Sequence, residues 1–150
     1  MAKLPIFRQT NSANCGPACL QMVLAYYGSG VSQKKLAVMA KTTKKSGTRP
    51  ENLVTVLRAN GIKAEARVTT LKELSSRVRK GNIAIVDYFL ESEGIGHYAV
   101  AVSFGKQPIG LNDPAPGNTL LHNPFFSCLA QRFNQNKKLR YFYSKEKWQK

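Results

Sequence analysis

The chain has 150 residues, of which 43% are hydrophobic and 9% aromatic. These values exclude a disordered polypeptide and fit one compact domain with a packed core. We therefore expect residues 1–150 to form a single domain, with a core at about 5–140 and a basic C-terminal tail at 134–150.

The net charge is +15, from 23 Lys and Arg against 8 Asp and Glu. Such a charge admits nucleic acid, an anionic membrane or an acidic peptide as partner. The basic residues are scattered and no nucleic-acid module signature accompanies them, so we expect no nucleic-acid partner. A basic nucleic-acid-binding protein remains an alternative that rests on charge alone.

Three cysteines, Cys15, Cys19 and Cys128, form no disulfide-rich spacing, which favours a reducing compartment. No CxxC pair or histidine cluster supplies a set of metal ligands, and we expect neither metal nor cofactor. The first residues have no apolar targeting segment, and no apolar run is long enough to span a membrane. We expect a soluble, cytoplasmic protein.

In chain order, residues 1–14 have no helical period and are expected to be an extended segment that ends at a helix N-cap. Apolar residues then recur at helical spacing as far as Gly28, and Pro17 falls in the first turn, where its missing N–H is tolerated. Three more helices are expected where a cap precedes an amphipathic segment, at 33–41, 51–60 and 71–80. Ser32, Thr70 and the Thr48–Arg49–Pro50 sequence are the expected helix starts.

A short strand is expected at 62–68, and after Gly81 the sequence becomes rich in residues that favour β-strands. The later strands are expected at 83–89, 97–104, 109–113 and 139–144, with a short helix at 125–133. Helices first and antiparallel strands later indicate an α+β fold, with N-terminal helices packed on a C-terminal antiparallel sheet.

Cys15 lies where the extended segment meets the first helix. A thiol attacks as its thiolate, and the unpaired N–H groups and dipole of a helix N-terminus favour negative charge there. Taken alone, a buried structural cysteine is the commoner interpretation. That interpretation is kept for Cys19 and Cys128.

A nucleophilic cysteine needs a base and an orienting acceptor. Of the two histidines, His97 opens an apolar strand, whereas His122 lies in a polar loop and is expected at the surface. Of the two aspartates, Asp113 ends the following strand and is preferred to Asp87. Adjacent antiparallel strands can bring His97 and Asp113 together.

An acyl-transfer intermediate also needs donors for its oxyanion. The Gln9 amide and the Cys15 backbone N–H are the candidates. Gly16 is expected to let the backbone approach a substrate closely.

Gln9, five further residues, CGPACLQMVLAYYG, GHYAVAV and LNDPAPG together resemble the double-glycine leader peptidases. These are papain-like cysteine peptidase domains that process bacteriocins and lanthipeptides, in most members at the N-terminus of an ABC transporter. The resemblance covers about residues 5–140. It implies a papain-like fold, with Cys15 as nucleophile, His97 as general base and later acid, Asp113 as orienting carboxylate and Gln9 in the oxyanion hole.

The family usually has an acidic residue before the cysteine, whereas Asn14 stands there in this chain. The implied reaction is cleavage of a precursor peptide after Gly-Gly or Gly-Ala, with an acidic, helical leader held in an apolar groove. A glycine-selective channel would lie near Cys15 and His97, and Tyr98 and the segment Gly94 to Gly96 are its expected neighbours. Gly16, Tyr98 and Gly96 are accordingly expected to contact substrate.

Two alternatives accompany this interpretation. One is a catalytically silent leader-binding docking domain, and the other is a papain-like protease for another Gly-Gly-ending substrate. The resemblance also implies membrane-spanning and ATP-binding transporter domains as partners, at the cytoplasmic face of the membrane. No ATP-binding motif accompanies the peptidase motifs, which leaves both a transporter domain and a stand-alone peptidase open.

Overall fold

The computed structural model describes residues 4–90, 95–103, 109–115 and 139–144. Several expectations lie outside these residues: the helix at 125–133, the surface position of His122 and the burial of Cys128. They stay predictions.

The described helices all lie in the first part of the chain. They are α1 (Cys15–Tyr26), α2 (Gln33–Met39), α3 (Pro50–Ala59) and α4 (Leu71–Arg79). The strands are β1 (Ala64–Thr69), β2 (Ala84–Leu90), β3 (Ile95–Ser103), β4 (Ile109–Asn112) and β5 (Leu139–Ser144). Each helix and strand expected within the described residues is present, and the α+β class is confirmed.

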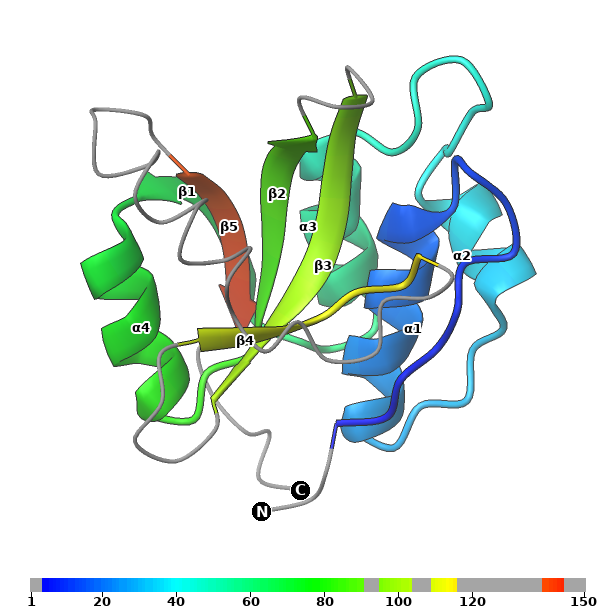
Figure 1. Cartoon of the computed structure of the whole chain (residues 1–150). Helices are drawn as coiled ribbons and strands as arrows, with labels where there is room; N and C mark the ends of the chain where they lie inside the picture. The colour runs from blue at the N-terminus through cyan, green and yellow to red at the C-terminus, as the bar shows by residue number, and fades with distance from the viewer. Residues whose placement is uncertain (1–3, 91–94, 104–108, 116–138, 145–150) are drawn as a thin grey trace.

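The strands form one sheet in the order β1-β5-β2-β3-β4, and every neighbouring pair is antiparallel. Consecutive strands β2, β3 and β4 form the expected meander. β5 pairs with both β1 and β2, so it is an interior strand, drawn in red in Figure 1. The strand expected at 139–144 is therefore present, and its backbone completes the ladder between two earlier strands, whereas the bounds of the core and of the basic tail stay predictions.

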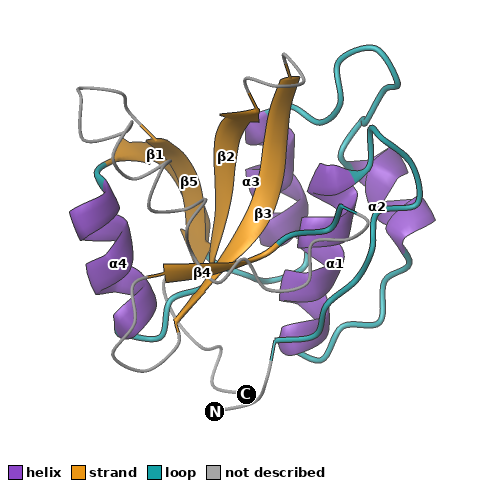
Figure 2. Ribbon diagram, viewed as in Figure 1, coloured by secondary structure: helices purple, strands orange, loops and turns teal. Residues whose placement is uncertain are grey.

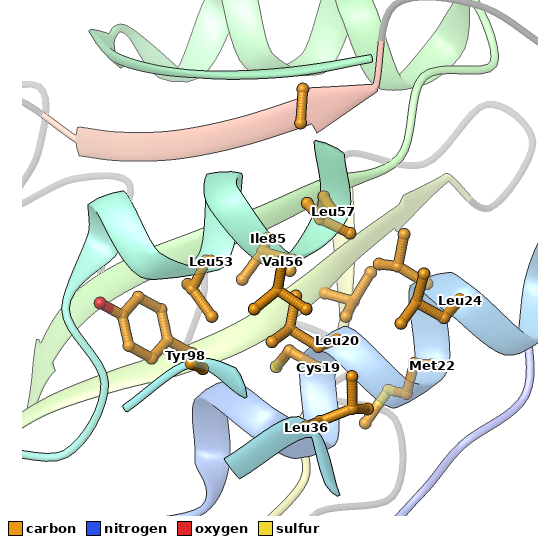
Figure 3. Packing of buried hydrophobic residues seen from close by; sticks show 14 of the residues in the cluster. Cys19, Leu20, Met22, Leu24, Leu36, Leu53, Val56, Leu57, Ile85 and Tyr98 are labelled. Atoms are coloured by element: carbon orange, nitrogen blue, oxygen red, sulfur yellow. The ribbon is translucent and has the colours of Figure 1, made fainter. Parts of the chain in front are cut away.

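The sheet separates two groups of helices. Helices α1, α2 and α3 lie on one side of β2 and β3, and α4 lies on the other (Figures 1 and 2). Apolar side chains of α1, α2, α3 and the sheet make up the main core, among them Leu20, Leu36, Leu53 and Ile85 (Figure 3). This packing fixes the N-terminus of α1 against β3.

Two of the four helices begin with the expected side-chain cap, and the other two do not. Ser32 accepts from the N–H of Lys35 at 3.4 Å and Thr70 from that of Glu73 at 3.3 Å, as N-caps do. Asn14 is the N-cap of α1, but its side chain does not cap the helix. Likewise α3 begins at Pro50 without a side-chain cap, and Thr48 contacts Thr42 instead. In both helices the expected capping side chain hydrogen-bonds with another residue instead of with the helix N-terminus.

At the other end of α1, Gly28 has a φ of 86°, a left-handed conformation that suits glycine and ends the helix there. Among the described residues, none of the helices combines the length and apolar character that crossing a membrane requires.

Candidate active site

Cys15 is the first residue of α1. The preceding residues form a turn in which Asn11 Oδ1 accepts from the N–H of Ala13 at 2.9 Å and Asn11 O from that of Asn14 at 3.1 Å. An asparagine that bonds the backbone two residues on is a common turn former. The turn delivers Cys15 to the helix N-terminus, where the helix dipole favours negative charge on its sulfur.

His97 lies in β3 and is buried. Its Nε2 lies 2.8 Å from Asp113 Oδ1, and Cys15 lies close enough to influence the pKa of the ring. Because Asp113 engages Nε2, Nδ1 is the nitrogen left for Cys15. The structure thus joins His97 of β3 to Asp113 at the end of β4, and the start of α1 carries Cys15 close enough to influence the pKa of His97.

Asp113 follows the last residue of β4, and its carboxylate is fixed locally as well as by His97. Oδ1 also accepts from the N–H of Ala115 at 2.8 Å, and Oδ2 accepts from the Tyr88 hydroxyl at 2.8 Å. Pro114 between them has no N–H and cannot extend the ladder. The Asp-Pro-Ala sequence therefore forms a turn that aims the carboxylate at β3.

Burial lowers the pKa of His97, but the hydrogen bonds and charges of Asp113 and Cys15 outweigh it and raise that pKa to about 9. Burial would raise the pKa of Asp113, yet its bonds with His97, Ala115 and Tyr88 hold it below the usual value. The pair is therefore an imidazolium and a carboxylate near neutral pH.

Cys19 lies one helical turn beyond Cys15 and is fully buried among core side chains (Figure 3). Burial, with smaller contributions from Cys15 and Asp113, raises the pKa of its thiol. Both Cys15 and Cys19 are free cysteines. Among the described residues, no three His, Cys, Asp or Glu side chains are grouped so that they could hold a metal ion.

Gln9 lies beside the Asp113 turn, because its backbone N–H donates to Pro114 O at 2.8 Å. The Arg8 guanidinium donates to Ala115 O in the same turn. The Gln9 Nε2 donates to Asn11 O at 3.0 Å, which leaves its second amide hydrogen for another acceptor. Its Oε1 is buried and finds no hydrogen-bond partner among the described residues.

Gln33 of α2 holds the residues on both sides of Gln9. Its Oε1 accepts from the N–H and the hydroxyl of Thr10 at 2.8 and 3.0 Å, and its Nε2 donates to Arg8 O at 2.9 Å. The Thr10 hydroxyl in turn accepts from Asn14 Nδ2 at 2.7 Å. This network joins α2, the Gln9 segment and the residue before Cys15, and it explains why Asn14 does not cap α1.

The three residues expected to contact substrate are placed differently. Gly16 is buried, and a Cβ there would lie 2.7 Å from Thr48 Oγ1, so close packing requires the glycine. Tyr98 is buried in the core, and its hydroxyl donates to Thr48 O at 2.9 Å. Gly96 is exposed next to His97. Their contacts with substrate stay predictions.

Sequence reasoning missed Tyr88 and Gln33. Tyr88 lies opposite His97 in the β2–β3 register, a pairing that residue types alone do not reveal. Gln33 directly follows the helix cap Ser32, and this position is the one sequence feature that could have marked it. In α2 its side chain faces inward and is only 6% exposed.

The model of the peptidase C39 family matches residues 3–143. The chain belongs to the peptidase C39 family. An uncharacterized protein of Methanothermobacter marburgensis is 33% identical over 122 residues, which are 81% of this chain and 80% of that protein. ComA of Streptococcus pneumoniae, a transport/processing ATP-binding protein, is 33% identical over 121 residues, 77% of this chain but 16% of ComA.

Solved structures of this family share the fold. The peptidase domain of Streptococcus ComA, a bi-functional ABC transporter, superimposes with a TM-score of 0.70 and 22% identity, covering 96% of this chain and 100% of that domain. A double-glycine motif protease from an AMS/PCAT transporter, solved with its leader peptide, gives 0.68 and 23% identity, covering 96% of this chain and 94% of that chain. The papain-like fold predicted for this C39 chain is confirmed, and membership of this family implies a cysteine peptidase.

Proposed function

We propose that this C39 peptidase removes the leader from a bacteriocin or lanthipeptide precursor by cutting after a Gly-Gly or Gly-Ala pair. The observation that carries the proposal is the 2.8 Å hydrogen bond between His97 and Asp113, with Cys15 close enough to raise the pKa of His97. Support comes from the relatives, because ComA is a transport/processing ATP-binding protein and the similar AMS/PCAT domain is a double-glycine motif protease.

In the proposed reaction the Cys15 thiolate attacks the carbonyl carbon of the second glycine. The developing oxyanion accepts hydrogen bonds from the Cys15 backbone N–H and from the second amide hydrogen of Gln9. His97 gives its proton to the leaving amine, so the peptide bond breaks and a thioester with Cys15 remains. Water then attacks the thioester and gives a proton to His97, which releases the leader as a carboxylate product and restores the Cys15 thiolate and the His97 imidazolium.

Asp113 has an orienting role in this sequence. Its carboxylate holds the Nε2–H of His97, so that Nδ1 faces Cys15 and the imidazolium is stabilised. The buried pair is kept from water, which strengthens this interaction relative to an exposed one.

We place the reaction in the cytoplasm, with an acidic helical leader as substrate and the membrane-spanning and ATP-binding domains of a transporter as partners. The chain's net charge of +15 would attract an acidic leader, and the association rate would fall as salt rises.

The test is mass spectrometry of a synthetic precursor incubated with the protein. A peptide with an acidic helical leader ending in Gly-Gly should give two products that meet after the second glycine. The matched peptide with Ala-Ala at that point should stay intact. Tight binding without any turnover from pH 6 to 9 would overturn the proposal in favour of a docking domain, and equal cleavage of both peptides would overturn the glycine specificity.

A further inference from the structure

Tyr88 contacts both members of the His97–Asp113 pair. It stands directly opposite His97 in the antiparallel β2–β3 register. The two rings meet edge to face, with centroids 5.4 Å apart and an interplanar angle of 84°. Tyr88 is 5% exposed, so this contact is shielded from water. The ring of Tyr88 thus limits how the imidazole can tilt.

The Tyr88 hydroxyl completes the hydrogen bonding of Asp113. Oδ1 already accepts from His97 and from the Ala115 N–H, whereas Oδ2 accepts from Tyr88 at 2.8 Å. Among the described residues, no other group donates a hydrogen bond to Asp113 Oδ2. A buried carboxylate oxygen without a donor is costly, so this bond helps to keep Asp113 ionised and fixes the rotation of its carboxylate.

The Tyr88 hydroxyl stays protonated and therefore remains a hydrogen-bond donor. Burial and the charge of Asp113 raise the pKa of Tyr88, so the phenol keeps its proton over the working range of the enzyme. Tyr98 offers a comparison within the same sheet, since its hydroxyl bonds a backbone carbonyl of the Thr48 loop instead. Of these two buried tyrosines, Tyr88 is the one that bonds the carboxylate.

We propose that Tyr88 is a positioning residue for the peptidase reaction, and this inference rests on the proposed function. It acts through Asp113 and His97 and does not touch the substrate. Its hydroxyl holds the carboxylate so that Oδ1 meets Nε2, while its ring holds the imidazole plane. Loss of the hydroxyl alone should leave substrate binding intact and slow the chemical step.

The first test compares cleavage of the Gly-Gly precursor by the full chain and by Tyr88→Phe, which keeps the ring. We expect kcat to fall about tenfold, the effect of one bond to a charged group, with KM unchanged. Tyr26→Phe, the same change at the far end of α1, is the matched control and should keep the wild-type kcat. A wild-type kcat for Tyr88→Phe would overturn the inference.

The second test separates positioning from general support of the fold. Asp87 and Asp113 are the two aspartates of the chain, so ¹³C labelling of aspartate carboxyls gives two signals to titrate. Tyr88→Phe should raise the pKa of Asp113 by about one unit and leave that of Asp87 unchanged. A loss of kcat without this shift would overturn the inference, because the hydroxyl would then not act through Asp113.

A third comparison uses the double variant. If Tyr88 acts through Asp113, Tyr88→Phe should cost little in the background of Asp113→Asn, whereas additive losses would contradict it.

The carboxyl titration of Asp113 does not depend on peptide cleavage. A wild-type protein that fails to cut any Gly-Gly peptide would overturn the proposed function, and with it the catalytic role of Tyr88. The titration would still decide whether Tyr88 holds Asp113.

Discussion

His97 Nε2 and Asp113 Oδ1 lie 2.8 Å apart in the interior, joined across two adjacent strands. The Asp113 bond to His97 is the largest of the effects that raise the pKa of His97, ahead of the influence of Cys15. The ring is therefore protonated at neutral pH although burial opposes the charge. This relationship gives the proposed mechanism a measurable pH signature.

We expect kcat/KM for a Gly-Gly peptide to fall above about pH 9. The folded-state pKa of His97 is raised to about 9, so the imidazolium is present below that pH and is lost as pH rises through it. In Asp113→Asn the high-pH limb should move down by about 1–3 pH units, because the charged partner is removed. Values of kcat/KM measured from pH 6 to 10 at constant ionic strength test this expectation. The same high-pH decline in Asp113→Asn as in the wild type would contradict it.

Gly16→Ala should destabilise the fold by about 1–3 kcal/mol, the usual cost of an overpacked site. The added Cβ would lie 2.7 Å from Thr48 Oγ1 and 2.8 Å from Thr48 Cβ. Gly30→Ala is the matched control, since nothing lies within 4 Å of its Cβ. Urea unfolding of both variants measures the difference, and equal stability would show that Gly16 does not need to be small for packing.

Gln33→Ala should reduce kcat by acting on Gln9. The variant leaves Arg8 O and the Thr10 N–H without the amide that holds them, so the segment between them loosens. If this is the route, Gln33→Ala should cost little more in a Gln9→Ala background.

Asn52→Ala is the control for the Gln33 test. It removes a side-chain amide bond of 2.8 Å to Ala40 O, outside the candidate site. It should lower stability but not kcat, and comparable kcat losses for Asn52→Ala and Gln33→Ala would argue against a specific link to Gln9.

Gly96→Ala tests whether Gly96 lines the substrate channel. A Cβ at this exposed position would meet Asp87 Oδ1 at 3.6 Å, an ordinary contact, so stability should not change. If substrate glycines pass here, KM should rise about tenfold, as for one steric mismatch in a pocket. Steady-state kinetics and thermal melting decide the point, and an unchanged KM would remove Gly96 from the predicted channel.

Local patterns predicted most of the secondary structure. Helical spacing after Cys15, the caps at Ser32 and Thr70, and the β-rich runs all depend on neighbours in sequence. The position of β5 between β1 and β2 could not be read this way, since it depends on pairing with two segments that both lie far from β5 in the chain.

The candidate site was predictable where its chemistry is local. The Asp113 turn is encoded by Asp-Pro-Ala, and Cys15 by its place at a helix start. Tyr88 was missed because the β2–β3 register sets its partner. The reason for Gly16 was also hidden, because Thr48 is brought against it only by tertiary packing.

Cys15 is proposed as the nucleophile, whereas Cys19 is a core residue. Cleavage rates of one Gly-Gly precursor by the wild type, Cys15→Ala and Cys19→Ala test this central claim directly, with circular dichroism to check that each protein is folded. We predict no cleavage by Cys15→Ala and most of the wild-type rate for Cys19→Ala. Cleavage by Cys15→Ala at the normal rate, or equal loss in both variants, would contradict the claim.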